Sequence, residues 1–168
     1  MRVAVTGTPG TGKSTAVEAV DTDLATVHLN EVIREEGLTT AHDAGRDSAV
    51  ADLEGVAAYL DGRDDVLFES HLAHHFEADR VVVLRCHPEE LVDRLRERGE
   101  PADKAEENAE SEALDVILAE AVDRHGADSV YEVDTTDRDP DAVAAAIEAV
   151  VTGERDPGAG TVSFIEYL

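Results

Sequence analysis

The chain has 168 residues, enough for one domain with a hydrophobic core and too few for two domains of ordinary size. Its 39 acidic residues against 14 lysines and arginines give a formal net charge of -25, which disfavours binding of bare nucleic acid, because phosphate contacts need clustered basic side chains. No apolar run approaches the length of a membrane span, and no signal-peptide pattern precedes the first strand. The lone Cys86 cannot form an internal disulfide, which agrees with a reducing compartment. We therefore expect a single-domain cytoplasmic protein.

A phosphate-binding P-loop is predicted near the start of the chain. The residues G-T-P-G-T-G-K-S at positions 7–14 fit the pattern G-x-x-x-x-G-K-[ST], follow an apolar strand over 2–6 and open a helix over 14–20. Glycines let backbone N–H groups turn toward phosphate oxygens, Lys13 can follow the β- and γ-phosphates, and the Ser14 hydroxyl can ligate Mg²⁺. The order of strand, loop and helix disfavours the alternative, a glycine-rich turn without a ligand. The residues expected to bind the nucleotide are Gly10, Thr11, Gly12, Lys13, Ser14 and Thr15, the last through the α-phosphate.

The next segment is predicted to hold a strand, two helices and an irregular connection. A strand over 25–29 is followed by Asn30, which can cap a helix that runs to position 37. Residues 38–47 show no periodicity and are interpreted as a mobile connection. Ser48 is then expected to cap a helix that ends at position 62, because helical spacing is kept by Val50, Leu53, Val56, Ala57 and Leu60.

A carboxylate is expected at the edge of the sheet where the nucleotide binds. The strand over 65–69 ends in Glu69, and open α/β sheets bind their ligands at the carboxyl ends of their strands. Glu69 is therefore a candidate to hold Mg²⁺ through water, the alternative being a solvated side chain after a core strand. His71, His74 and His75 follow, but no Cys or further acidic ligand stands at a spacing that would support a zinc site. His71 stands nearest to Glu69 and is the histidine expected to act at the reaction centre.

Two arginines are candidates for a phosphate clamp. A strand over 80–85 precedes a helix that begins at position 88, and on this helix Arg94 and Arg98 are four residues apart and share a face. The alternative is that they pair with Glu90 and Asp93 of the same helix.

The remaining chain completes an α/β fold. A long helix is predicted from Asp103 to Arg124, with a polar first half that projects from the core, followed by a strand over 129–133 and a helix over 141–151. The tail over 153–168 has no predicted position. Five strands that alternate with helices around a P-loop predict a five-stranded parallel sheet covered by helices on both faces, the three-layer fold of P-loop NTPases.

With these motifs in place, the sequence resembles the nucleoside monophosphate (NMP) kinases, and specifically the adenylate kinase isoenzyme 6 group with its archaeal homologues. The resemblance is carried by G-T-P-G-T-G-K-S-T at 7–15, V-I-R-E-E-G at 32–37, E-S-H at 69–71, and R-G with a later E-N within 98–108. It implies an NMP-binding region over about 28–51, in which Arg34 contacts the acceptor phosphate, and a short lid over about 98–108, with Arg98 above the donor phosphates.

The resemblance has departures as well. Glu69 and His71 correspond to the family's acidic-x-His motif, with Glu where some members have Asp. The lid lacks the extra arginines of larger adenylate kinases, and Glu100 replaces an aromatic residue that some members carry.

The leading predicted function is transfer of the terminal phosphate of Mg²⁺-ATP to AMP or another NMP, with Lys13, Arg94 and Arg98 neutralising the transferring group. The resemblance also implies ATPase activity and a role in late small ribosomal subunit and 16S rRNA maturation, with the basic eleventh small-subunit ribosomal protein as partner. A kinase of another small metabolite stays open, whereas a GTPase switch is disfavoured because no N-K-x-D motif occurs. The charge predicts adaptation to a salt-rich cytoplasm, an acidic surface for a basic partner being a compatible alternative.

Overall fold

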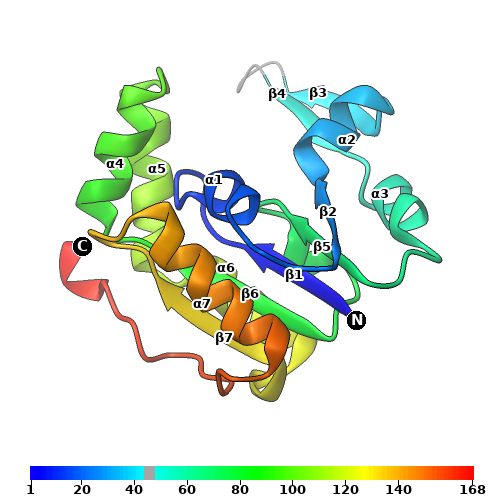
Figure 1. The fold of residues 1–168 in the computed structure, drawn as a ribbon. Helices are drawn as coiled ribbons and strands as arrows, with labels where there is room; N and C mark the ends of the chain where they lie inside the picture. The colour runs from blue at the N-terminus through cyan, green and yellow to red at the C-terminus, as the bar shows by residue number, and fades with distance from the viewer. Residues whose placement is uncertain (44–47) are drawn as a thin grey trace.

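A computed structural model gives the structure of residues 1–43 and 48–168. At its centre is a parallel sheet of five strands in the order β2-β5-β1-β6-β7 (Figure 1). β1 lies between β5 and β6, so the loop that follows it leaves the sheet at its centre. The predicted five-stranded parallel sheet is confirmed. Its strands are β1 (Arg2–Thr6), β2 (Ala25–His28), β5 (Val66–Glu69), β6 (Arg80–Arg85) and β7 (Val130–Asp134).

Helices cover both faces of this sheet, because its strands carry apolar side chains on both. Val3 and Val5 belong to the buried cluster of one face, which α1 (Lys13–Glu18) and α7 (Pro140–Thr152) cover. Ala4, between them in the strand, belongs to the cluster of the other face. That face is covered by α3 (Leu53–Leu60), the 3₁₀ helix η1 (Ala73–His75) and α6 (Val116–His125). The predicted three-layer α/β fold of P-loop NTPases is confirmed.

Further elements stand on either side of the loop that follows β1 (Figure 1). On one side, α4 (Pro88–Glu97) and α5 (Ala102–Ala113) pack through a buried cluster that contains Leu91, Leu95 and Ala105. On the other side stands α2 (Leu29–Glu35) with the two-stranded sheet of β3 (Thr39–Asp43) and β4 (Ser48–Ala51).

The prediction for the segment between α2 and α3 is wrong. Instead of an irregular connection and the start of a helix, β3 and β4 form an antiparallel pair, and the residues 44–47 that join them lie outside the described part of the chain. The apolar spacing is misleading because Val50, which fits the helical pattern, lies exposed in β4, whereas Val56 and Leu60 are fully buried in α3.

Two predicted helix caps are also wrong. Asp52, and not Ser48, caps α3, and its carboxylate accepts a hydrogen bond from the backbone N–H of Gly55 at 3.0 Å. Asn30 lies inside α2, where its side-chain oxygen accepts a hydrogen bond from the hydroxyl of Ser70 at 3.1 Å.

The long helix predicted from Asp103 to Arg124 is two helices. α5 and α6 are separated at Asp115, which has a left-handed backbone with φ 56°. The first half of α5 packs against α4 through small side chains, in a buried cluster separate from those of the sheet. The buried positions of α5 are Ala105, Ala109, Glu112 and Ala113.

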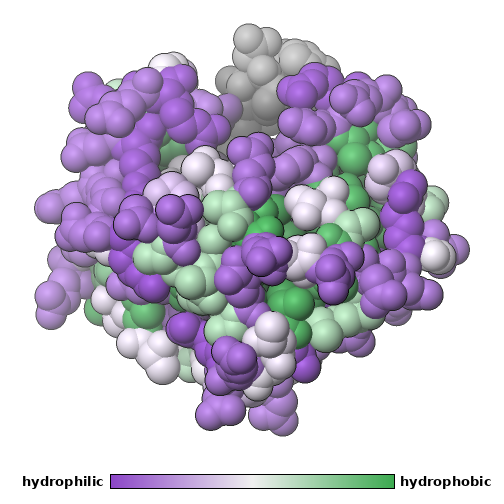
Figure 2. Space-filling view, in the orientation of Figure 1, coloured by the Kyte–Doolittle hydropathy of each residue, from purple (hydrophilic) through white to green (hydrophobic). Residues whose placement is uncertain are grey.

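The tail lies beside the edge strand β7. Gly158 forms a parallel bridge with Tyr131, and the backbone N–H of Thr161 donates to Oε2 of Glu132 at 2.9 Å. The short 3₁₀ helices η2 (Ala127–Ser129) and η3 (Ile165–Tyr167) complete the fold. Hydrophilic side chains cover most of the face shown in Figure 2. Within residues 1–43 and 48–168, no helix combines the length and the apolar character that a membrane span needs.

Candidate active site

The loop after β1 passes its neighbours so closely that only glycine fits at two of its positions. A Cβ on Gly7 would lie 2.6 Å from the carbonyl oxygen of Leu84, and a Cβ on Gly10 would lie 2.9 Å from Cδ1 of Leu91. Gly10 also has a φ of 94°, which side chains other than glycine rarely adopt. The loop therefore curls tightly between β1 and α1, as a phosphate-binding loop must.

Lys13, the first residue of α1, points back into this loop. Its ammonium donates hydrogen bonds to the carbonyl oxygens of Gly7 at 2.9 Å and Thr8 at 3.1 Å. Burial lowers the pKa of Lys13 to about 8, although Glu69 and Glu112 act in the opposite direction. The direct partners of the charge in the described residues are neutral oxygens. An anionic phosphate in the loop would supply the missing countercharge, so the site fits a nucleotide.

Ser14 and Glu69 meet at the position expected for Mg²⁺. The Ser14 hydroxyl donates to Oε1 of Glu69 at 2.9 Å, and Nδ1 of His28 lies 2.8 Å from the same oxygen. The contact follows from the topology, since β5 pairs with β1 and ends at Glu69 beside the loop. A hydroxyl and a carboxylate are oxygen ligands of the kind that Mg²⁺ prefers beside phosphates, so the pair fits this ion.

Lys13, Ser14 and Glu69 line a cleft of about 600 Å³ together with two arginines from the end of α4. Arg94 donates to the carbonyl oxygen of Gly10 at 3.3 Å and also pairs with Glu90 on its own helix. Both arrangements considered for Arg94 therefore occur together: it lies in the cleft, as predicted for a phosphate clamp, and it also forms the ion pair with Glu90 that was the alternative. The ion pair holds its side chain so that it faces the loop. The predicted residues that line the cleft are Gly10, Thr11, Gly12, Lys13, Ser14, Thr15, Glu69, His71, Arg94 and Arg98.

Arg34 is the predicted site residue that does not line this cleft. It lies exposed on α2, a helix that begins directly after His28. Because His28 contacts Glu69, α2 is connected to the carboxylate proposed to face the metal. The role of Arg34 in binding the acceptor stays a prediction.

The three histidines that are close in the sequence lie in two different places. His71 lines the cleft, and burial, helped by the charge of Lys13, lowers its pKa to about 4, so its ring is neutral at pH 7. His74 and His75 lie in η1, outside the cleft. The expectation that no acidic group supports them is wrong, because Glu120 of α6 reaches Nε2 of His74 with a distance of 2.7 Å. Glu120 is far from His74 in the sequence, so residue spacing gave no sign of this contact.

Several residues near the loop were not predicted as part of the site. Asn30, Thr135 and Arg138 also line the cleft. Thr135 directly follows β7, so the strand-end rule that identified Glu69 could have found it. Glu112 accepts a hydrogen bond from the Thr8 hydroxyl at 2.5 Å and lies buried, but its place in a polar run gave no sequence signal.

Comparison with known proteins places the chain in a family. A sequence-family model described as "AAA domain" matches residues 3–115. Proteins named "Putative adenylate kinase" are 67% identical in Natronomonas pharaonis and 59% identical in Halobacterium salinarum, with 100% of both sequences covered in each comparison. A crystal structure of shikimate kinase from Bacteroides thetaiotaomicron has a TM-score of 0.59 over 90% of this chain and 98% of that one, at 15% identity, which shows a shared fold alone. The chain therefore belongs to the AAA-domain family of P-loop proteins, together with these relatives that bear the adenylate kinase name.

Proposed function

We propose that the protein is an adenylate kinase that transfers the terminal phosphate of Mg²⁺-ATP to AMP. One observation supports this above the others: the loop lysine, the Ser14–Glu69 pair and two arginines line the same cleft. Nucleotide phosphotransfer needs cationic and metal-ligating groups around one phosphate chain, and little covalent chemistry from the protein. The kinase name of the relatives and the P-loop kinase fold support a phosphotransferase.

The roles follow from the positions of the side chains. Lys13 would contact the β- and γ-phosphates, and Arg94 and Arg98 would contact the transferring group from the α4 side. Mg²⁺ would be held by the Ser14 hydroxyl and, through water, by Glu69, and it would neutralise charge on the phosphates. His71, neutral at pH 7, would donate or accept a hydrogen bond in the cleft without adding charge.

The acceptor is proposed to bind on the opposite side, in the region 28–51 that contains α2, β3 and β4 (Figure 1). The proposal includes contact between Arg34 and the acceptor phosphate. The turn after α4 and the first part of α5, residues 98–108, would act as the lid over the donor. These assignments rest on the resemblance to the isoenzyme 6 group and on the placement of the two segments on either side of the loop.

A second candidate function is an ATP-driven assembly factor for the small ribosomal subunit, in which ATP hydrolysis replaces transfer to AMP. The net charge of -25 favours it, because an acidic surface suits a basic ribosomal protein. The same P-loop groups would bind ATP in either case. The two functions differ in whether an acceptor nucleotide is needed.

A coupled assay in molar KCl separates them. Turnover is measured with ATP alone and with ATP plus each common NMP, and the first function requires that AMP raise ADP formation well above the rate with ATP alone. Hydrolysis of ATP that no NMP changes would reject the kinase and favour the assembly factor. Phosphorylation of a different small metabolite would reject both.

Arg34→Ala tests the acceptor assignment. A bidentate guanidinium contact with phosphate is not reproduced by Ala, so the KM for AMP should rise about tenfold or more while hydrolysis of ATP alone stays near the wild-type rate. Arg63→Ala is the matched control, because Arg63 is also exposed, lies beyond α3 and does not line the cleft. Equal loss of transfer and hydrolysis in Arg34→Ala would place this side chain on the donor side.

A further inference from the structure

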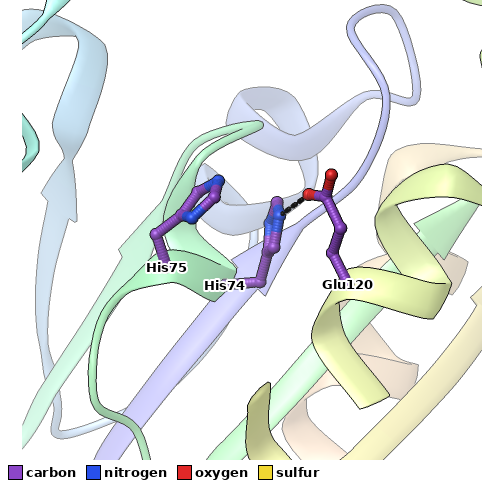
Figure 3. Close-up of side chains that lie close together, drawn as sticks. All are labelled: His74, His75 and Glu120. Carbon is purple, nitrogen blue, oxygen red and sulfur yellow. Dashed lines mark hydrogen bonds and ion pairs between the residues drawn. The ribbon is translucent and has the colours of Figure 1, made fainter. Parts of the chain in front are cut away.

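Two histidines and a glutamate meet outside the P-loop cleft (Figure 3). His74 and His75 come from η1, and Glu120 comes from α6, which packs on the same face of the sheet. Each residue offers one ligand atom, and these three atoms lie within 4.8 Å of one another. The cluster combines two imidazoles and one carboxylate, which is a ligand set that zinc accepts while a fourth position stays open to water.

His74 is hydrogen-bonded at both ring nitrogens. Nε2 lies 2.7 Å from Oε2 of Glu120, and Nδ1 lies 2.7 Å from the hydroxyl oxygen of Thr6. Because a carboxylate only accepts, Nε2 carries the proton and Nδ1 accepts from the Thr6 hydroxyl. A metal would replace the proton on Nε2, and Nδ1–H would then donate to Thr6, since a hydroxyl can take either role. Metal-bound histidines usually donate their second nitrogen in this way.

His75 has an unmet hydrogen-bonding nitrogen. Its Nδ1 is shielded from solvent and has no hydrogen-bond partner within residues 1–43 and 48–168. A buried polar atom without a partner is less stable than a hydrogen-bonded one. The His75 ring is tilted against that of His74, with 4.4 Å between the ring centroids. Burial lowers the pKa of both histidines, so at pH 7 they are in the neutral form that binds metals.

The surroundings leave room for an ion and its water. His74 and His75 line a cavity of about 520 Å³. Arg124 and Arg2 also line it and oppose a cation, but Glu77 and Asp79 in the same wall offset them, and Glu120 adds a further negative charge beside His74. Glu120 is 46% exposed, so its carboxylate can shift without disturbing the core.

We propose that His74, His75 and Glu120 form a binding site for a divalent transition metal of the zinc class. Ligands bound to one tetrahedral zinc lie about 3.3 Å apart, given metal–ligand bonds of about 2.0–2.2 Å. On binding, Nε2 of His74 and Oε2 of Glu120, now 2.7 Å apart, must therefore separate, while the cluster as a whole adjusts from separations of up to 4.8 Å. The exposed Glu120 side chain and the ring of His75 supply this movement. Through His74 and Thr6, the last residue of β1, the metal would be connected to the start of the P-loop. The site does not depend on the proposed reaction.

Cobalt binding tests the site on the full chain. The protein is stripped with chelator and titrated with Co²⁺ in molar KCl with excess Mg²⁺, which keeps Co²⁺ out of oxygen-ligand sites. One equivalent should produce the intense visible absorption of tetrahedral, nitrogen-bound Co²⁺, and Zn²⁺ should abolish it. Melting temperature should rise with metal concentration, because the ion binds the folded chain. Absence of the tetrahedral spectrum in the wild type would overturn the proposal.

Matched variants distinguish this site from general attraction of cations to an acidic protein. Glu120→Gln and His75→Ala should each weaken Co²⁺ binding about tenfold or more. Glu77→Gln removes the same charge as Glu120→Gln, from a residue that lines the cavity beside His74 and His75, and should bind like the wild type. Far-ultraviolet circular dichroism confirms that each variant is folded. If all three variants lose affinity equally, or if none does, the assignment of the ligands is wrong.

Discussion

Lys13 combines a buried position with a charge that has neutral direct partners. Its pKa is lowered to about 8, so in the free protein its ammonium begins to lose its proton near that pH. The folded pKa lies below the unfolded value of about 10.4. Between these two values the unfolded chain binds more protons, so the stability of the free protein rises with pH in this window. Phosphate binding reverses the preference, because a phosphate stabilises the protonated form.

Nucleotide affinity should therefore fall as pH rises above about 8. Binding then takes up a proton at Lys13, and the affinity for ATP decreases by up to about tenfold per pH unit. Isothermal titration calorimetry on either side of pH 8 measures this slope. Lys13→Arg is the control, because arginine stays protonated, and its weaker binding should show no such slope. A slope of equal size in this variant would assign the titration to another group.

Lys13→Ala should abolish turnover and leave the fold intact. Loss of a phosphate-binding cation at the reaction centre costs about a hundredfold or more in rate. Stability should not fall, because the substitution removes a buried charge whose contacts are carbonyl oxygens. A thermal melt and a transfer assay on the same sample check both statements. Turnover near the wild-type level would exclude the P-loop from the mechanism.

The site could be predicted from the sequence where its chemistry is local. The loop motif specifies Gly10, Lys13 and Ser14 within one turn, and the strand-end rule locates Glu69. Contacts between distant segments gave no such signal. The bond from Thr8 to Glu112 and the pairing of His74 with Glu120 depend on how α5 and α6 pack against the sheet. Periodicity does not report that packing.

At the scale of elements, the sequence predicted the strands of the main sheet and missed the local interruptions. A buried parallel strand is a continuous apolar run, which is a strong signal. The β3–β4 pair was missed because its strands are short and because Val50 of β4 fits the helical spacing that continues into α3. The break between α5 and α6 was missed because it depends on one residue, Asp115, which has a left-handed backbone conformation. The residues around Asp115 favour a helix, so the sequence pattern gave no sign of the break.

Asp115 should be sensitive to substitution for this reason. Asp and Asn tolerate the left-handed conformation better than Ala. Asp115→Ala should lower the free energy of unfolding by about 1–2 kcal/mol. Asp115→Asn should cost about 0.5 kcal/mol, from its half-exposed ion pair with Arg85. Chemical denaturation of both variants gives the comparison, and equal losses would show that the charge, which both variants remove, matters more than backbone conformation.

Glu112 connects α5 to both the P-loop and the sheet. One carboxylate oxygen accepts from Thr8, and the other accepts from Nε of Arg85 at 2.7 Å. Although burial lowers the pKa of Arg85, Glu112 and Asp115 raise it further than burial lowers it, so the guanidinium stays charged. Glu132 contacts the same guanidinium at 2.6 Å.

Glu112→Ala should therefore destabilise the protein by about 3 kcal/mol, at the lower end for a broken buried ion pair, because Arg85 keeps two carboxylates. Glu112→Gln should cost less, since its amide oxygen can still accept a hydrogen bond. Denaturation in constant KCl measures both. A neutral result for Glu112→Ala would mean that the helix is held by its alanines alone.

At the scale of the whole molecule, charge is the dominant feature. The acidic side chains lie outside the core, apart from buried ones such as Glu69, Glu112 and Glu132, which have hydrogen-bond partners. The positive groups of the P-loop cleft, Lys13, Arg94 and Arg98, therefore stand inside a strongly negative shell. That shell repels a nucleotide at long range in dilute buffer, and added salt removes the repulsion faster than it weakens the contacts within the cleft.

Folding should depend on salt for the same reason. With a net charge of -25, the folded state repels itself at low ionic strength, and the screening length falls from about 10 Å at 0.1 M to about 3 Å at 1 M salt. Thermal melts followed by circular dichroism should show a melting temperature that rises with KCl.

The triple variant Glu106→Lys, Glu107→Lys and Glu110→Lys changes exposed positions of α5 and makes the charge less negative. It should melt above the wild type in dilute buffer and converge with it in molar KCl. A neutral osmolyte stabilises by exclusion without screening charge, so it should raise both proteins equally and leave their difference unchanged. Equal stability of the wild type in dilute and molar salt would reject self-repulsion as the consequence of its composition.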